Sequence, residues 1–167
     1  MNIDENDLHA KFFEAYGRAV LSWQYVEHEM FLLFSALIRA PDPATASGAY
    51  HAVVNFRTRL SMINAAAQAA LKALHPGLWD DWIGAKAILS AYSGKRNDLA
   101  HMTLLGVTKN DEISLRLGPG IFIDTGGDPK SYALEDIEDV SREFIDFAKF
   151  LDELGQRISE ALPRPSK

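Results

Sequence analysis

Apolar residues recur every three or four positions along four long stretches of this 167-residue chain. That spacing gathers them on one side of a helix, so each stretch is predicted to form an amphipathic α-helix. Prolines and a Pro-Gly pair separate the first three stretches, as expected where helices end. Residues 42–48 are read as a connector with room for one short helical turn. The predicted helices span residues 7–39, 49–74, 78–102 and 134–162.

The periodicity changes between the third and fourth predicted helices. Residues 113–117 alternate between apolar and polar, as a strand with one buried face does. An apolar run at 104–107 precedes them, turn-forming residues lie between, and 121–123 is a candidate third strand. We therefore predict a β-hairpin insertion at about residues 103–124. The expected fold class is mostly α, a bundle of four long helices with this hairpin before the last helix.

The composition is that of one globular domain covering residues 1–167, with a disordered tail at 163–167. Apolar residues make up 47% of the chain, and the lack of cysteine excludes disulfides and thiolate metal sites. The acidic first residues do not resemble a signal peptide, and the longest apolar run is too short to span a bilayer. Acidic residues opening the last helix suit its dipole. We therefore expect a cytoplasmic protein with no membrane association, metal or other cofactor.

The first predicted helix carries two neighbouring apolar stripes, which together form an unusually wide apolar face. Such a face is typical of a helix at the centre of a bundle or at a contact with a second copy of the chain. Glu27 interrupts one stripe a turn after Trp23. We predict that Glu27 pairs with Arg96 inside the same chain; the alternative is that Glu27 is solvated at the edge of the stripe.

The segment from Lys95 to Met102, which ends the third predicted helix, brings together side chains suited to phosphodiester chemistry. Asn97 and His101 are four residues apart and share a helix face, and the long side chain of Arg96 can reach the same side. Arginine binds phosphate through a bidentate fork, and histidine can transfer a proton near neutral pH. Arg96, Asn97 and His101 are therefore the candidate catalytic residues.

A structural role for Arg96 is the alternative. Position 96 falls inside the apolar stripe of its helix, where an unpaired charge would be very unfavourable. Arg96 then faces a polar cleft or pairs with a carboxylate in an ion pair that fixes the register of the helix. A further alternative is that Arg96 is a basic residue at the end of the helix, near the negative end of the helix dipole.

The run Arg96-Asn97-Asp98-Leu99-Ala100-His101, at the end of a helix in a small helical protein, resembles the HEPN superfamily. Its signature is an arginine followed by a polar residue, with a histidine four to six residues further on. The resemblance implies a helical dimer in which two motifs line one cleft. Many members are metal-independent endoribonucleases, often toxins or defence proteins, and others only bind. Thr103 stands where some toxins carry a tyrosine that a partner enzyme modifies, so that form of neutralisation is not expected here.

Two functions from different classes follow. The first is a metal-independent endoribonuclease of HEPN type, related to toxins or defence, with RNA as substrate, a homodimeric state and an antitoxin or other protein partner. Lys95, Arg57 and Arg59 are the further candidates for a basic cleft. Arg57 and Arg59 fall off the apolar stripe of their helix and should be exposed, where they either contact phosphate at the rim of a cleft or are ordinary surface charge. The second is a non-catalytic dimeric binding or scaffold protein. The net charge of −6 favours the second, because non-specific RNA binding relies on basic surface.

Overall fold

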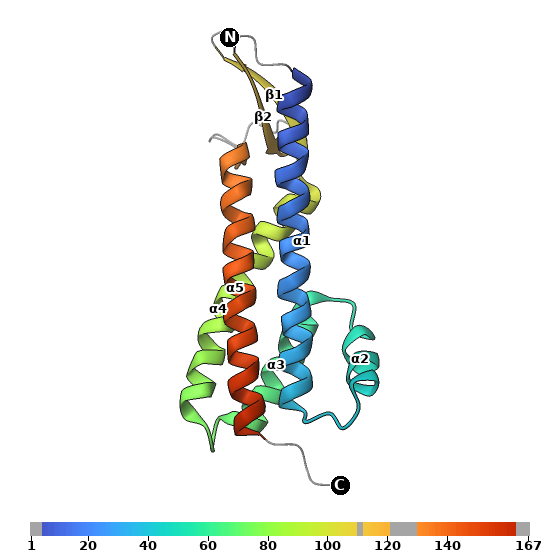
Figure 1. Ribbon diagram of the computed structural model, residues 1–167, viewed down its shortest axis with the longest axis vertical. Helices are drawn as coiled ribbons and strands as arrows, with labels where there is room; N and C mark the ends of the chain where they lie inside the picture. Colours follow the sequence, from blue (N-terminus) through green and yellow to red (C-terminus); the bar gives the residue numbers. More distant parts are fainter. Residues whose placement is uncertain (1–4, 110–111, 121–129, 163–167) are drawn as a thin grey trace. The chain divides into compact units, whose positions relative to one another are not determined.

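The computed structural model describes residues 5–109, 112–120 and 130–162 (Figure 1). It is mostly helical, and an antiparallel two-stranded hairpin precedes the last helix, as the sequence predicts. The third candidate strand at 121–123 and the predicted disordered tail lie outside the described residues. The elements in chain order are α1 (Glu5–Leu37), α2 (Pro43–His51), α3 (Phe56–Leu71), α4 (Pro76–His101), β1 (Thr103–Lys109), β2 (Glu112–Gly118) and α5 (Leu134–Ala161).

The predicted helix at 49–74 is wrong at its start, and so is the connector at 42–48. Helix α2 occupies most of that connector, and α3 begins only at Phe56. Pro43 opens α2 because the first turn of a helix tolerates proline, and the Asp42 carboxylate accepts the amides of Ala44 and Thr45. The Asn55 side chain caps α3 in the same way, by accepting the Thr58 amide at 3.2 Å.

Contacts divide the chain into two compact units. Unit 1 comprises residues 1–24 and 92–145, and unit 2 comprises residues 25–91 and 146–167. Helices α1, α4 and α5 each contribute residues to both units. The motif at the end of α4 and the whole hairpin belong to unit 1.

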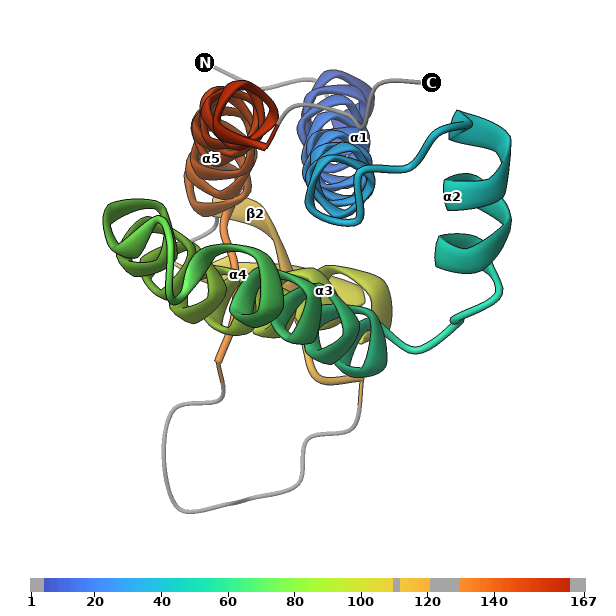
Figure 2. The ribbon, with the colours of Figure 1, turned by 90° about the horizontal axis from the view of Figure 1, so that it is seen from below.

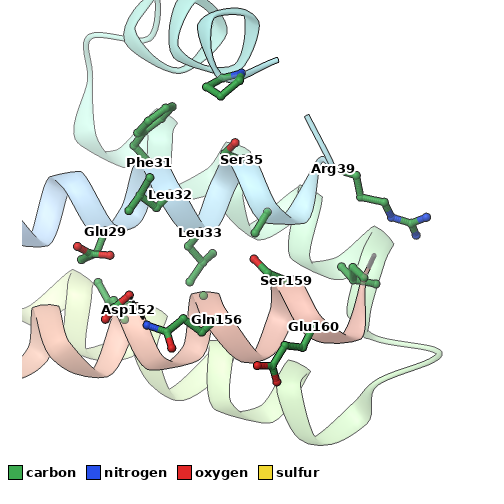
Figure 3. A pocket seen from close by; sticks show the side chains of 15 residues that line it. Glu29, Phe31, Leu32, Leu33, Ser35, Arg39, Asp152, Gln156, Ser159 and Glu160 are labelled. Atoms are coloured by element: carbon green, nitrogen blue, oxygen red, sulfur yellow. Dashed lines mark hydrogen bonds between the residues drawn. The ribbon is translucent and has the colours of Figure 1, made fainter. Parts of the chain in front are cut away.

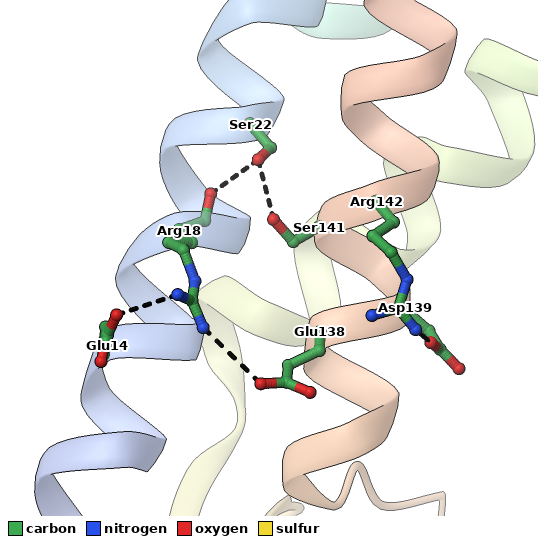
Figure 4. Close-up of polar contacts among 7 residues, drawn as sticks. All are labelled: Glu14, Arg18, Ser22, Glu138, Asp139, Ser141 and Arg142. Carbon is green, nitrogen blue, oxygen red and sulfur yellow. Dashed lines mark hydrogen bonds and ion pairs between the residues drawn. The ribbon is translucent and has the colours of Figure 1, made fainter.

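The core of unit 1 forms around Phe144 of α5, which is fully buried. Its ring meets Trp23 of α1 at 5.2 Å and Tyr92 of α4 at 5.4 Å between centroids, both edge-on. Such geometry adds to the stabilisation from burying large rings. Beside this core, the buried Ser22 hydroxyl donates to the carbonyl of Arg18 at 2.8 Å and lies 2.9 Å from the Ser141 hydroxyl (Figure 4).

An ion-pair group also links α1 with α5 in unit 1. The Arg18 guanidinium lies between Glu14 of its own helix, at 2.9 Å, and Glu138 of α5, at 3.6 Å (Figure 4). Arg142 pairs with Asp139, one turn earlier on α5. These side chains are largely exposed, so each pair contributes little to stability.

In unit 2, helix α2 lies beside the second half of α1 (Figures 1 and 2). The buried Tyr50 ring of α2 contacts Phe31 and Phe34 of α1 at 5.5 and 5.8 Å between centroids. Trp82 of α4 is also fully buried, and its indole N–H donates to the Asn64 side chain of α3 at 3.2 Å. That bond satisfies the one polar atom that the buried indole brings into the core.

The hairpin pairs Thr103 with Gly118 at its open end. On β2 the side chains alternate, so that Leu115 and Leu117 are buried while Arg116 is exposed. Leu117 also exchanges two backbone hydrogen bonds with Tyr132, at 2.9 and 2.8 Å. The segment that leads into α5 is thereby attached to the edge of the hairpin.

None of the described helices combines the length and the apolarity needed to cross a membrane.

We predict that Phe144→Ala lowers the free energy of unfolding by about 3–5 kcal/mol, because it leaves a cavity between two aromatic rings. Urea unfolding followed by circular dichroism measures this change. Leu74→Ala is the control, since Leu74 is 75% exposed, and it should change the stability by about 1 kcal/mol or less. Equal losses in the two variants would contradict this account of the core.

Candidate functional site

The motif forms the last two turns of α4. Leu99 is buried, and its carbonyl accepts the Tyr16 hydroxyl of α1 at 3.1 Å, which attaches the end of α4 to unit 1. Arg96, Asn97 and His101 are all exposed. The helix ends at His101, and β1 begins two residues later. The three predicted catalytic side chains therefore face solvent on one short piece of helix.

Arg96 is not buried, although its spacing places it inside the apolar stripe of α4. Trp82, Ala85 and Leu89 of this stripe are buried, as predicted. Towards the end of α4, however, the side of the helix that other elements cover is the one that carries Lys95 and Leu99. The stripe is not kept because the elements that contact this end of the helix approach it from a different side. The guanidinium of Arg96 donates only to the neighbouring Asn97 side chain, at 3.3 Å, among the described contacts.

Glu27 pairs with Arg59 instead of the predicted partner Arg96. The carboxylate of Glu27 lies 3.6 Å from the guanidinium of Arg59, and both residues belong to unit 2. Sequence spacing alone identified an interrupted stripe, but it gave no information about which cation would meet it.

Arg59 was expected to be exposed and is not, since its side chain is only 16% exposed. Its Nε–H donates to the Val53 carbonyl, and its guanidinium lies 5.2 Å from the centroid of the Tyr50 ring. Burial of the Tyr50 phenol raises its pKa to about 12. Arg59 thus connects α1, α2 and α3 within unit 2. Arg57 is exposed, as predicted.

Lys95 is held by α5. Its ammonium group donates to the Glu143 carboxylate and lies 5.2 Å from the centroid of the Tyr92 ring. Glu143 compensates its charge, so Lys95 fixes the position of this end of α4 and adds little net positive charge to the surface.

Asp98 carries a network that the sequence analysis missed. Its carboxylate, only 25% exposed, accepts the Tyr132 hydroxyl at 2.7 Å and the ammonium group of Lys130. The hydrogen bond to Asp98 raises the pKa of Lys130, and burial raises the pKa of the Tyr132 phenol. Asp98 stands inside the motif run, but its partners are more than thirty residues away, so no local pattern could identify them.

Arg116 of β2 is the second residue that sequence reasoning missed. Its guanidinium donates to the Ser131 hydroxyl at 3.0 Å, and Ser131 stands between Lys130 and Tyr132. A lone arginine in a strand carries no signal by itself. Only the folded hairpin and the segment before α5 bring it towards the motif.

The pairing of charges distinguishes two arginines in unit 1. Arg96 and Arg116 donate to neutral partners among the described residues. Every other lysine or arginine whose side chain is described in this unit pairs with a carboxylate: Lys11, Arg18, Lys95, Lys130 and Arg142. Among the described side chains of unit 1, the positive charge without a carboxylate partner is therefore carried by Arg96 and Arg116.

A separate groove of about 530 Å³ lies in unit 2, between the second halves of α1 and α5 (Figure 3). Leu33 and Leu151 line it, and Glu29 and Asp152 face it from the two helices. Burial, and after it the nearby charge of Asp152, raises the pKa of the Glu29 carboxyl. None of the predicted catalytic or RNA-binding residues lines this groove.

Within the described ranges, no three histidine, aspartate or glutamate side chains gather closely enough to hold a metal ion. Searches against protein-family models, curated proteins and solved structures found no match for the chain.

We predict that Arg59→Ala lowers the free energy of unfolding by about 1–3 kcal/mol, because it leaves Glu27 and the Val53 carbonyl without their partner. Arg57→Ala removes the same charge two positions away from an exposed site, and should stay within about 0.5 kcal/mol of the parent. Urea unfolding of both variants makes the comparison. Equal stabilities would show that the Arg59 contacts contribute nothing.

Proposed function

We propose that the protein is a metal-independent endoribonuclease of HEPN type that acts through the exposed end of α4. The observation that carries the proposal is the placement of Arg96, Asn97 and His101 together on the last turns of this helix, in contact with solvent. Arg96 has no carboxylate partner among the described contacts, so its guanidinium is available to a phosphate.

In the proposed reaction, the 2′-hydroxyl of a ribose attacks the adjacent phosphorus and the bond to the 5′-oxygen breaks. His101 accepts the proton from the 2′-hydroxyl or donates one to the leaving 5′-oxygen. Arg96 stabilises the charge that develops on the phosphate, and Asn97 orients His101 or the substrate. The products carry a 2′,3′-cyclic phosphate and a 5′-hydroxyl. In a homodimer, two copies of His101 divide the roles of base and acid between them.

The net charge of −6 bears on the choice of substrate. A protein with this charge gains little from general attraction to RNA, so the proposed enzyme acts on a narrow set of RNAs. A toxin or defence role, and neutralisation by an antitoxin or other protein partner, belong to the same proposal and rest on the HEPN resemblance. A cytoplasmic location is proposed with them.

We expect the wild-type protein to cleave total RNA or a labelled tRNA pool in the presence of EDTA. His101→Ala and Arg96→Ala should each lower the rate by about 100-fold or more, since they remove the proton-transfer group and the phosphate ligand. Gel analysis measures cleavage. New 3′ ends that resist periodate, and from which phosphatase removes the phosphate only after acid treatment, identify the cyclic phosphate.

His28→Ala, which removes an exposed histidine of unit 2, is the matched control and should retain full activity. Arg96→Ala should also keep the thermal midpoint of the parent, because the Arg96 side chain is exposed and bonds only to its neighbour among the described contacts. Cleavage that requires magnesium would contradict the proposed chemistry. Unfolding of Arg96→Ala would show that this residue is structural.

A non-catalytic dimeric binding protein is the second candidate, and the surface of α1 in unit 1 favours it. Phe13 and Leu21 are 58% and 55% exposed, and they lie on one side of the helix with Gly17 between them. Exposed apolar side chains grouped in this way are typical of contact surfaces. In this candidate Arg96 and His101 stabilise the dimer instead of reacting with RNA, and the acidic net charge is no obstacle.

For either candidate we predict a homodimer in sedimentation velocity that Leu21→Glu converts to monomer, because the new charge would be buried against the second copy. Ser114→Glu adds the same charge at an exposed position of β2 and should leave the dimer intact. A monomeric wild type, or a dimer unaffected by Leu21→Glu, would remove α1 as the contact surface.

A further inference from the structure

We propose that Arg116 binds a second phosphate of the RNA, so that two guanidinium groups flank His101. This inference rests on the proposed function, and it deepens that function by assigning a residue that positions the substrate. It makes the hairpin part of the binding surface, with β2 supplying one of the two phosphate ligands.

Arg116 has hydrogen-bond donors available for a phosphate. Its side chain is exposed, and its described partner is the neutral hydroxyl of Ser131 at 3.0 Å. A guanidinium carries five N–H donors in a planar fork, so one bond to Ser131 sets its direction and leaves donors for a phosphate. Arg142, by contrast, already pairs with Asp139.

Residues 130–132 connect Arg116 with the motif at the end of α4. Ser131 is flanked by Lys130 and Tyr132, and both of these side chains bind the Asp98 carboxylate of α4. Leu117, the neighbour of Arg116, exchanges two backbone hydrogen bonds with Tyr132. Two contacts therefore hold Arg116 near the side of α4 that carries Asp98: its own bond to Ser131, and the backbone pairing of its neighbour Leu117 with Tyr132.

The spacing of residues along α4 determines where His101 lies around the helix axis relative to Arg96 and Asp98. At about 100° per residue, and counting from Arg96, Asn97 lies at about 100°, His101 at about 140° and Asp98 at about 200° around the axis. His101 therefore lies between the side that carries Arg96 and the side to which Arg116 is tied. An RNA strand that crosses the end of the helix meets a guanidinium on each side of the imidazole.

Asp98 does not oppose this arrangement, because Lys130 compensates its charge. The two residues form a positioning pair that holds the segment before α5 against α4. The positive charge offered to the RNA is that of Arg96 and Arg116.

The test measures binding without cleavage, in the His101→Ala protein. The probe is a fluorescein-labelled single-stranded RNA of mixed sequence, about 12 nucleotides long, in EDTA. Fluorescence anisotropy gives Kd from about 50 to about 200 mM KCl, and the slope of log Kd against log salt reports how many phosphates the protein neutralises. Adding Arg116→Ala should weaken binding about fivefold to tenfold and reduce the slope by about 0.7.

Arg142→Ala in the same background is the matched control. It removes one positive charge from the same unit but should leave both Kd and slope unchanged, within about twofold for Kd. Arg116→Lys should restore the slope, because a lysine still neutralises one phosphate. A purely structural role for Arg116 would lower affinity without moving the slope, and thermal unfolding shows whether each variant stays folded.

The outcomes separate this inference from the proposed ribonuclease. A slope unchanged by Arg116→Ala, or an His101→Ala protein that binds no RNA, overturns the role of Arg116. If wild type cleaves RNA in EDTA while Arg116→Ala matches Arg142→Ala, this inference alone fails. If binding depends on Arg116 but no RNA is cleaved in EDTA, the ribonuclease proposal fails and the second phosphate site stands.

Discussion

The carboxylate of Asp98 is the contact on which the arrangement of the candidate site depends. It accepts Lys130 and the Tyr132 hydroxyl, so the segment before α5 is held against the last turns of α4. Tyr132 in turn bonds to Leu117, and Ser131 receives Arg116, which ties the hairpin to the same place. A half-buried carboxylate needs partners that compensate its charge, and here those partners come from a distant part of the chain.

Charge pairing is the feature by which this acidic protein would offer the proposed phosphate-binding surface. Most described cations of unit 1 are matched with carboxylates, and this removes their attraction for a polyanion. Arg96 and Arg116 have neutral partners among the described contacts, so their two positive charges are the ones left for a phosphate in the proposed site. Such a pattern favours selective binding, because affinity then depends on a phosphate backbone that fits two fixed positions.

Much of the fold could be predicted because apolar residues recur at helical spacing along the long stretches, most regularly in α5, and the side chains of β2 alternate. The failures have specific causes. The start of α3 depends on the cap that Asn55 provides, and Pro43 opens a helix where it was read as a stop. Glu27 pairs with Arg59 and not with Arg96, and Arg59 is largely buried, since spacing along a helix identifies a face but not what packs against it.

The sequence by itself determined the helical class, the approximate extent of the long helices, the hairpin before α5 and the run from Arg96 to His101, because each depends on residues close together in the chain. Only the tertiary structure decided that Arg96 is exposed, that Asp98 holds Lys130 and Tyr132, and that Arg116 approaches the motif. These are contacts between residues up to a few tens of positions apart. Whether such residues meet depends on how whole elements pack, and no local pattern of residues carries that information.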